Sequence, residues 1–116
     1  MLSKPLQIGV YVTAKGRSPF KDWVLGLRDA LGQAAAYHRL DRLAQGNAGD
    51  FKRVGAIYEL RLFQGPGYRI YYGQDGPRLV VLLAGGDKST QVRDIRLATE
   101  YWHDYQARKA EALDPL

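Results

Sequence analysis

Residues 57–73 (IYELRLFQGPGYRIYYG) consist of two alternating segments separated by a turn, and this pattern is compatible with few folds. Apolar side chains occupy every second position in both segments, which is the period of a half-buried strand. Gln-Gly-Pro-Gly at residues 64–67 supplies the turn. We therefore predict an antiparallel hairpin with one core face and one open face that displays Glu59, Arg61, Arg69 and Tyr71.

The same alternation sets the register, because a one-residue slip would place apolar side chains beside charged ones. The expected pairs are Leu60–Ile70, Leu62–Tyr68, Arg61–Arg69 and Glu59–Tyr71. Two directly opposed arginines destabilise a sheet by an amount comparable to the roughly 0.2–1 kcal/mol that a good pair contributes. A carboxylate such as Glu59, splaying of the side chains into water, or an anionic ligand must offset this cost. Phosphate suits the planar fork of arginine.

The rest of the chain predicts an α+β domain with a mostly antiparallel sheet of four to five strands. Ser18 and Pro19 indicate a helix start, Gly32 a corner and Gly46 a helix end. The apolar run at 79–84 indicates a central strand buried on both faces. The expected strands are 6–12, the two arms of the hairpin and 79–84, and residues 51–55 are either a short strand or an extended lead-in to the hairpin. The expected helices are 19–30, 33–45 and 89–110, the last capped by Asp87 or Ser89. Residues 114–116 are expected to form a tail.

Composition limits the classes of function. The 116 residues fit a single domain spanning 1–116, with a core at about 6–110 and flexible ends. A net charge of +5 favours a nucleic-acid or acidic partner. The absence of Cys excludes disulfides and thiolate zinc sites, and two distant histidines argue against a metal. We expect no cofactor, no membrane span and no signal peptide, and therefore a cytoplasmic protein.

Basic residues gather around the hairpin in this interpretation. Lys52 and Arg53 precede it, Arg61 and Arg69 lie within it, and Lys88 follows the next strand. The simpler alternative is a solvated basic face. Tyr71 on the same face could stack on a base. The segment 85–90 (GGDKST) lacks the spacing of a nucleotide-binding P-loop, so a tight strand-to-helix corner is the better interpretation.

Four segments together resemble the addiction module killer proteins, a HigB-like branch of the RelE/ParE toxin superfamily. These segments are YELR at 58–61, GPGYRIYY at 65–72, LLAGGDKSTQ at 82–91 and YW at 101–102. The resemblance extends from about residue 10 to 105, and the Gly-Pro-Gly-Tyr-Arg and Gly-Gly-Asp-Lys motifs are its most specific parts. It implies a RelE-like fold with an N-terminal strand, a two-helix hairpin, the sheet and a C-terminal helix.

The resemblance also implies a function. RelE-like toxins of type II toxin-antitoxin pairs cleave mRNA on the ribosome, using the 2′-hydroxyl as nucleophile and arginines to stabilise the phosphate. By this analogy Arg61, Arg69 and Lys88 are catalytic, Glu59 is the general base or an orienting group, and Lys52, Arg53 and Tyr71 bind RNA. The expected partners are mRNA on the ribosome and a small antitoxin with a helix-turn-helix domain, which alone would contact operator DNA.

The sequence departs from the RelE-like pattern at one point, because no His or Tyr stands near the end of the sheet to act as general acid. Lys88 and Tyr71 are the alternatives for that role. Two rival functions remain open: a ParE-like, non-catalytic inhibitor of DNA gyrase that acts through the helical hairpin at 19–45, and a non-toxic subunit that only binds the antitoxin.

Overall fold

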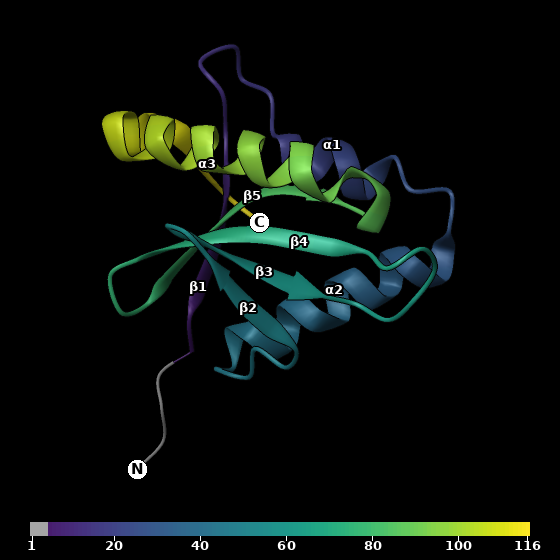
Figure 1. The fold of residues 1–116 in the computed structure, drawn as a ribbon. Coiled ribbons are helices and arrows are strands. Elements are labelled where there is room, and N and C mark those ends of the chain that lie inside the picture. The colour runs from purple at the N-terminus through teal and green to yellow at the C-terminus, as the bar shows by residue number, and fades with distance from the viewer. Residues whose placement is uncertain (1–4) are drawn as a thin grey trace.

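The computed structural model describes residues 5–116, and within them the chain forms an α+β domain, as predicted (Figure 1). Residues 1–4, for which flexibility was predicted, lie outside the described part. No helix of the described part is long and apolar enough to cross a membrane. The elements are β1 (Gln7–Tyr11), α1 (Pro19–Leu25), α2 (Ala30–Ala44), β2 (Phe51–Val54), β3 (Ile57–Arg61), β4 (Arg69–Asp75), β5 (Leu79–Gly86), the 3₁₀ turn η1 (Lys88–Thr90), α3 (Gln91–Arg108), the 3₁₀ turn η2 (Lys109–Ala112) and β6 (Leu113–Pro115).

The strands form one sheet in the order β2-β3-β4-β5-β1-β6. Among the strand pairs of the described residues only β1–β5 is parallel, which confirms the mostly antiparallel prediction. Within residues 5–116 the sheet has six strands rather than four or five, because residues predicted as a flexible tail form β6. Strand β6 pairs with β1, where it covers backbone groups that would otherwise form an exposed edge.

Helices cover both faces of the sheet, and Figure 1 shows α2 and α3 on opposite sides of it. On one face, α1 and α2 pack against alternate residues of the strands, among them Leu60, Ile70 and Leu82. On the other face, α3 packs against Ile57, Tyr71, Val81 and Leu83. The prediction of a single core face was therefore wrong. The two-sided burial of β5 was predicted correctly, and it requires cover on both faces of the strands beside it.

The helix boundaries differ from prediction where tertiary contacts decide them. Ser18 caps α1 and Pro19 is its first residue, as expected. However, α1 ends at Leu25 rather than at residue 30. Helix α2 begins at Ala30, three residues earlier than predicted. Asp29 caps it, because its side chain accepts a hydrogen bond from the Gly32 amide at 3.0 Å. Gly32 is therefore not a corner. It lies in the first turn of α2, where a Cβ would overlap the Tyr68 ring.

The two tryptophans pack directly onto glycines of the sheet. Trp102 of α3 lies on Gly73 of β4, and Trp23 of α1 lies on Gly85 of β5 from the opposite face. In both places a Cβ on the glycine would overlap the indole ring. These contacts fix the distance and position of α3 over β4 and of α1 over β5.

Candidate functional site

The hairpin register matches the prediction, and it brings the two arginines together. Arg61 pairs with Arg69 and Glu59 with Tyr71 across β3 and β4. Each arginine has its own carboxylate: Arg69 Nε lies 3.6 Å from Glu59 and Arg61 lies 3.5 Å from Asp50. The Arg61 side chain is 39% exposed and that of Arg69 is 12% exposed. The repulsion between Arg61 and Arg69 is therefore reduced by two carboxylates, the buried Glu59 and the partly exposed Asp50.

The turn after β3 folds back onto Arg69 and joins it to Lys88. Arg69 donates a hydrogen bond to the Gly67 carbonyl at 2.6 Å, and the Lys88 amide donates to the Pro66 carbonyl at 3.5 Å. Gly67 has a φ of 79°, a conformation that favours glycine. A Cβ there would also lie 3.1 Å from the Arg69 guanidinium. The glycine-rich turn thus allows the backbone to close around the arginine.

A cavity of about 370 Å³ opens at this end of the hairpin. Arg61, Arg69 and Lys88 all line it, so the structure brings together three of the four predicted catalytic residues. Arginine and lysine side chains around one hollow form a suitable site for a phosphate. The remaining lining comes from Asp50 and from Leu62, Phe63, Gly65, Pro66 and Gly67 of the turn.

Glu59 and Tyr71 do not lie on an open face as predicted. Both are fully buried beneath α3. Glu59 accepts a hydrogen bond from Gln91 at 2.9 Å and faces Arg69, so it can orient that guanidinium but does not line the cavity. Burial, followed by the negative charge of Glu59, raises the pKa of Tyr71 far above its ordinary value. A buried, neutral tyrosine cannot stack on a base, so the RNA-binding role predicted for Tyr71 was wrong.

The two basic residues that precede the hairpin lie on opposite faces of the sheet. Lys52 pairs with Glu59 and therefore shares the face of the two arginines. Arg53 pairs with Tyr58, with its guanidinium 5.6 Å from the centre of that ring, and it donates to the Gly55 carbonyl at 3.0 Å. The predicted grouping of Arg53 with the basic face was wrong, because adjacent strand residues point to opposite sides.

The segment GGDKST forms the predicted corner between strand and helix. Asp87 accepts a hydrogen bond from the Ser89 amide at 2.8 Å, in a capping box with Thr90. The Thr90 hydroxyl in turn donates to Asp94, which is buried next to Gly86. These contacts hold η1 rigidly enough to place the exposed Lys88 at the rim of the cavity.

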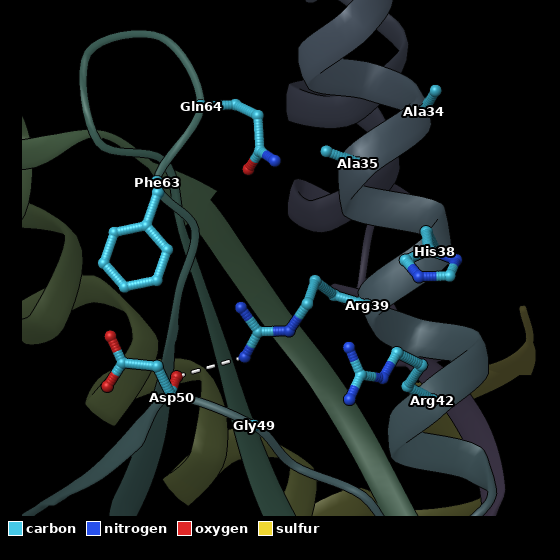
Figure 2. A pocket seen from close by; sticks show the side chains of 9 residues that line it. All are labelled: Ala34, Ala35, His38, Arg39, Arg42, Gly49, Asp50, Phe63 and Gln64. Carbon is cyan, nitrogen blue, oxygen red and sulfur yellow. Dashed lines mark hydrogen bonds between the residues drawn. The ribbon is translucent and has the colours of Figure 1, made fainter.

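A second cavity, of about 480 Å³, lies between α2 and the hairpin turn (Figure 2). His38, Arg39 and Arg42 extend from α2, while Phe63 and Gln64 come from the turn. Burial lowers the pKa of Arg39, whose guanidinium donates to the carbonyls of Arg61, Ala48 and Asp50. Arg39 thus holds the start of β2 against the end of β3.

The sequence reasoning missed this second cavity and the role of Asp50, which lines both cavities. The available signal was the basic triplet His38, Arg39 and Arg42 on the polar side of α2, which faces the loop ahead of the hairpin. Among residues 5–116, no group of three or more His, Asp or Glu side chains is placed to hold a metal ion. The side chains around the first cavity favour an anionic ligand.

Comparison with known proteins gives the chain a relative. No family model matches it. An uncharacterized protein of Haemophilus influenzae is 45% identical over 80 residues, which cover 68% of this chain and 81% of the relative. Identity at this level over most of the relative means that the two chains share a fold and an ancestor. The chain therefore belongs to the same family as this uncharacterized Haemophilus influenzae protein.

Proposed function

We propose that this protein is the toxin of a bacterial type II toxin-antitoxin pair, and that it cleaves mRNA on the ribosome without a metal. The observation that carries the proposal is the convergence of Arg61, Arg69 and Lys88 on one cavity. The two motifs most specific to the addiction module killer proteins, Gly-Pro-Gly-Tyr-Arg and Gly-Gly-Asp-Lys, contribute to the cavity that these side chains line. The α+β architecture supports a RelE-like fold.

The chemistry follows from what the cavity presents. The RNA 2′-oxygen forms a bond to the adjacent phosphorus while the bond from phosphorus to the 5′-oxygen breaks, leaving a 2′,3′-cyclic phosphate and a free 5′-hydroxyl. Arg61 and Arg69 stabilise the negative charge that develops on the phosphate oxygens. Arg69 is held ready for this by the buried Glu59 and by the Gly67 carbonyl.

Two proton transfers complete the step. Asp50 lines the cavity, keeps a 35% exposed side chain and takes the proton of the 2′-hydroxyl, a role that the buried Glu59 cannot fill. Lys88 gives a proton to the departing 5′-oxygen, and it takes this role in place of Tyr71 because it alone of the two lines the cavity. Glu59 then acts as a positioning residue for Arg69.

The partners follow from the same site. The cognate antitoxin, a small protein with a helix-turn-helix domain, covers or distorts the basic face in the resting cell. Operator DNA is contacted through the antitoxin alone. The toxin acts in the cytoplasm, where its substrate, mRNA on the ribosome, is found.

Primer extension on cellular mRNA after induction of the protein tests the proposal. Induction should stop growth and produce breaks within translated codons. Arg61→Ala, Arg69→Ala and Asp50→Asn should each reduce the breaks by two orders of magnitude or more, which is typical for loss of charge stabilisation or general-base catalysis. Arg78→Ala, at the exposed turn between β4 and β5, is the matched control and should cleave normally. Growth arrest with intact mRNA would contradict the proposal.

One observation favours a second candidate, the ParE-like inhibition of DNA gyrase. Apolar side chains stand exposed along the helical hairpin: Leu25 is 67% exposed, Leu31 80% and Tyr37 38%. If this surface binds gyrase, Leu25→Ser with Leu31→Ser will abolish toxicity, whereas Arg61→Ala with Arg69→Ala will not. DNA breaks in the induced cells would accompany that result. A protein that binds the antitoxin but never arrests growth would instead be the non-toxic subunit.

A further inference from the structure

The two cavities at the hairpin turn are adjacent, and together they form a basic track longer than the proposed chemistry needs. Asp50 and Phe63 line both of them. The first cavity holds Arg61, Arg69 and Lys88, and the second holds His38 and Arg42 on the far side of Phe63. A single phosphate occupies only a small part of this combined space, so the second cavity is available for the substrate that flanks it.

We propose that the second cavity binds the nucleotides next to the scissile phosphate, with Phe63 as a stacking platform for a base and Arg42 as a contact to a neighbouring phosphate. This inference rests on the proposed function, because it takes the first cavity to hold the scissile phosphate of a single-stranded RNA. It adds a specific subsite to that function and assigns a role to residues outside the reaction itself.

Phe63 is unusual for its exposure. Its side chain is 85% exposed, compared with 48% for Phe51 and 38% for Tyr37. An exposed aromatic ring between two basic hollows is the combination that single-stranded nucleic-acid sites use, where rings stack on bases and cations follow the backbone. Figure 2 shows the Phe63 ring on the hairpin side of the cavity, opposite the side chains that extend from α2.

The arginines of the second cavity have different tasks. Arg39 uses its guanidinium on backbone carbonyls, including Asp50 at 3.1 Å, and so is committed to holding the loop. Arg42 is exposed, and its guanidinium has no hydrogen bond to another residue that lines the cavity (Figure 2). Among the described residues that line this cavity, Arg42 therefore provides the free positive charge, and exposed His38 lies one helical turn before it.

Binding of uncleavable RNAs tests the subsite apart from cleavage. The RNAs carry a 2′-deoxy nucleotide at the cut position: one is a dinucleotide, and two hexanucleotides extend it to the 5′ or the 3′ side. Fluorescence anisotropy should show that one of the hexanucleotides binds the wild type about 5- to 160-fold more tightly than the dinucleotide, the gain expected from stacking of one base. Phe63→Ala and Arg42→Ala should each remove much of this gain. Arg42 lines only the second cavity, so Arg42→Ala should leave dinucleotide binding unchanged.

The dependence of RNA affinity on salt concentration separates the stacking contribution of Phe63 from the charge contribution of Arg42. Arg42→Ala should make the negative slope of log affinity against log salt shallower by about 0.7, the value for one phosphate contact on a single strand. Phe63→Ala should leave that slope unchanged. Arg78→Ala and Leu25→Ala, a cation and an exposed apolar side chain outside both cavities, serve as matched controls and should behave like the wild type.

The results that would refute the subsite differ from those that would refute the proposed nuclease function. If mRNA is cleaved and Arg69→Ala weakens dinucleotide binding, yet Phe63→Ala and Arg42→Ala bind every RNA as the wild type does, the subsite is refuted and the nuclease stands. If the wild type binds neither hexanucleotide better than the dinucleotide, the subsite is likewise refuted. Tight binding of an acidic antitoxin peptide that needs Arg42 and Phe63, without any gain for longer RNA, would assign the cavity to the antitoxin instead.

Discussion

The ion pair between Arg69 and Glu59 predicts an asymmetry between two substitutions. The Glu59 side chain is 1% exposed and the Arg69 side chain is 12% exposed. Arg69→Ala leaves a carboxylate buried without its cation, and removal of one partner of a buried pair typically costs about 3–5 kcal/mol. Gln91 still donates a hydrogen bond to Glu59 in this variant. We therefore expect Arg69→Ala to lower the free energy of unfolding by about 3 kcal/mol, the lower end of that range.

Glu59→Gln should lower the free energy of unfolding by less than Arg69→Ala does. Arg69 keeps its hydrogen bond to the Gly67 carbonyl and faces a cavity that water can enter. We expect a loss of about 1–2 kcal/mol, in the range for a hydrogen bond to a charged group. Urea unfolding monitored by circular dichroism should show a midpoint lowered by about 1.5–2 M for Arg69→Ala, if the slope is about 1.5–2 kcal/mol/M, and by clearly less for Glu59→Gln.

The double substitution is the decisive test. Removing the charge of Glu59 also removes the reason for the instability of Arg69→Ala, so the double variant should be more stable than Arg69→Ala alone. It should remain inactive, because the arginine itself contacts the phosphate in the proposed reaction. A double variant whose losses simply add would refute the ion-pair reasoning, and one that regains cleavage would refute a direct role for Arg69.

Three further expectations come from other parts of the fold. Gly73→Ala places a methyl group in the tryptophan ring that lies on it, so it should destabilise the protein by about 1–3 kcal/mol in urea unfolding; unchanged stability would show that α3 shifts freely. The hydrogen bond from Tyr105 at 2.6 Å holds the pKa of Asp75 below its ordinary value. The contribution of Asp75 to stability is therefore present at neutral pH and lost as the pH falls below about 4 through the folded-state pKa. Asp75→Asn should weaken the acid-side slope of an unfolding series, and a slope that stays the same would contradict this. Finally, if the protein cleaves RNA as proposed, Lys52→Ala should reduce cleavage whereas Arg53→Ala should not, because of these two residues only Lys52 shares the face of Arg61 and Arg69; equal effects in the primer-extension assay would refute the assignment of faces.

Much of the local structure could be predicted because neighbouring residues determine it. The period-two alternation predicted the β3–β4 pairing residue by residue, and the opposed arginines followed from it. Ser18 and Pro19 predicted the start of α1. Asp87, one of two predicted caps for the last helix, instead caps η1, and Thr90 precedes α3 without a side-chain cap. The central position of β5 followed from its continuous apolar run.

The errors arose where a distant segment decides the environment. Alternation shows which residues share a face of the hairpin, but it does not show what covers that face. Only the packing of α3 decides that Glu59 and Tyr71 are buried, and only the pairing with β1 makes β6 a strand. The early start of α2 depends on Asp29, which also binds Tyr68 from the hairpin turn at 3.0 Å.

The sequence by itself therefore determined the hairpin, its register and the pairing of Arg61 with Arg69, because cross-strand pairing and turn chemistry depend on short stretches of chain. Tertiary structure decided which of those side chains remains accessible. It buried Glu59, left Arg69 at the wall of a cavity, and brought Lys88, Asp50 and the basic residues of α2 to the same turn. The physical reason is that burial is a property of the packed layers, which form from segments far apart in the chain.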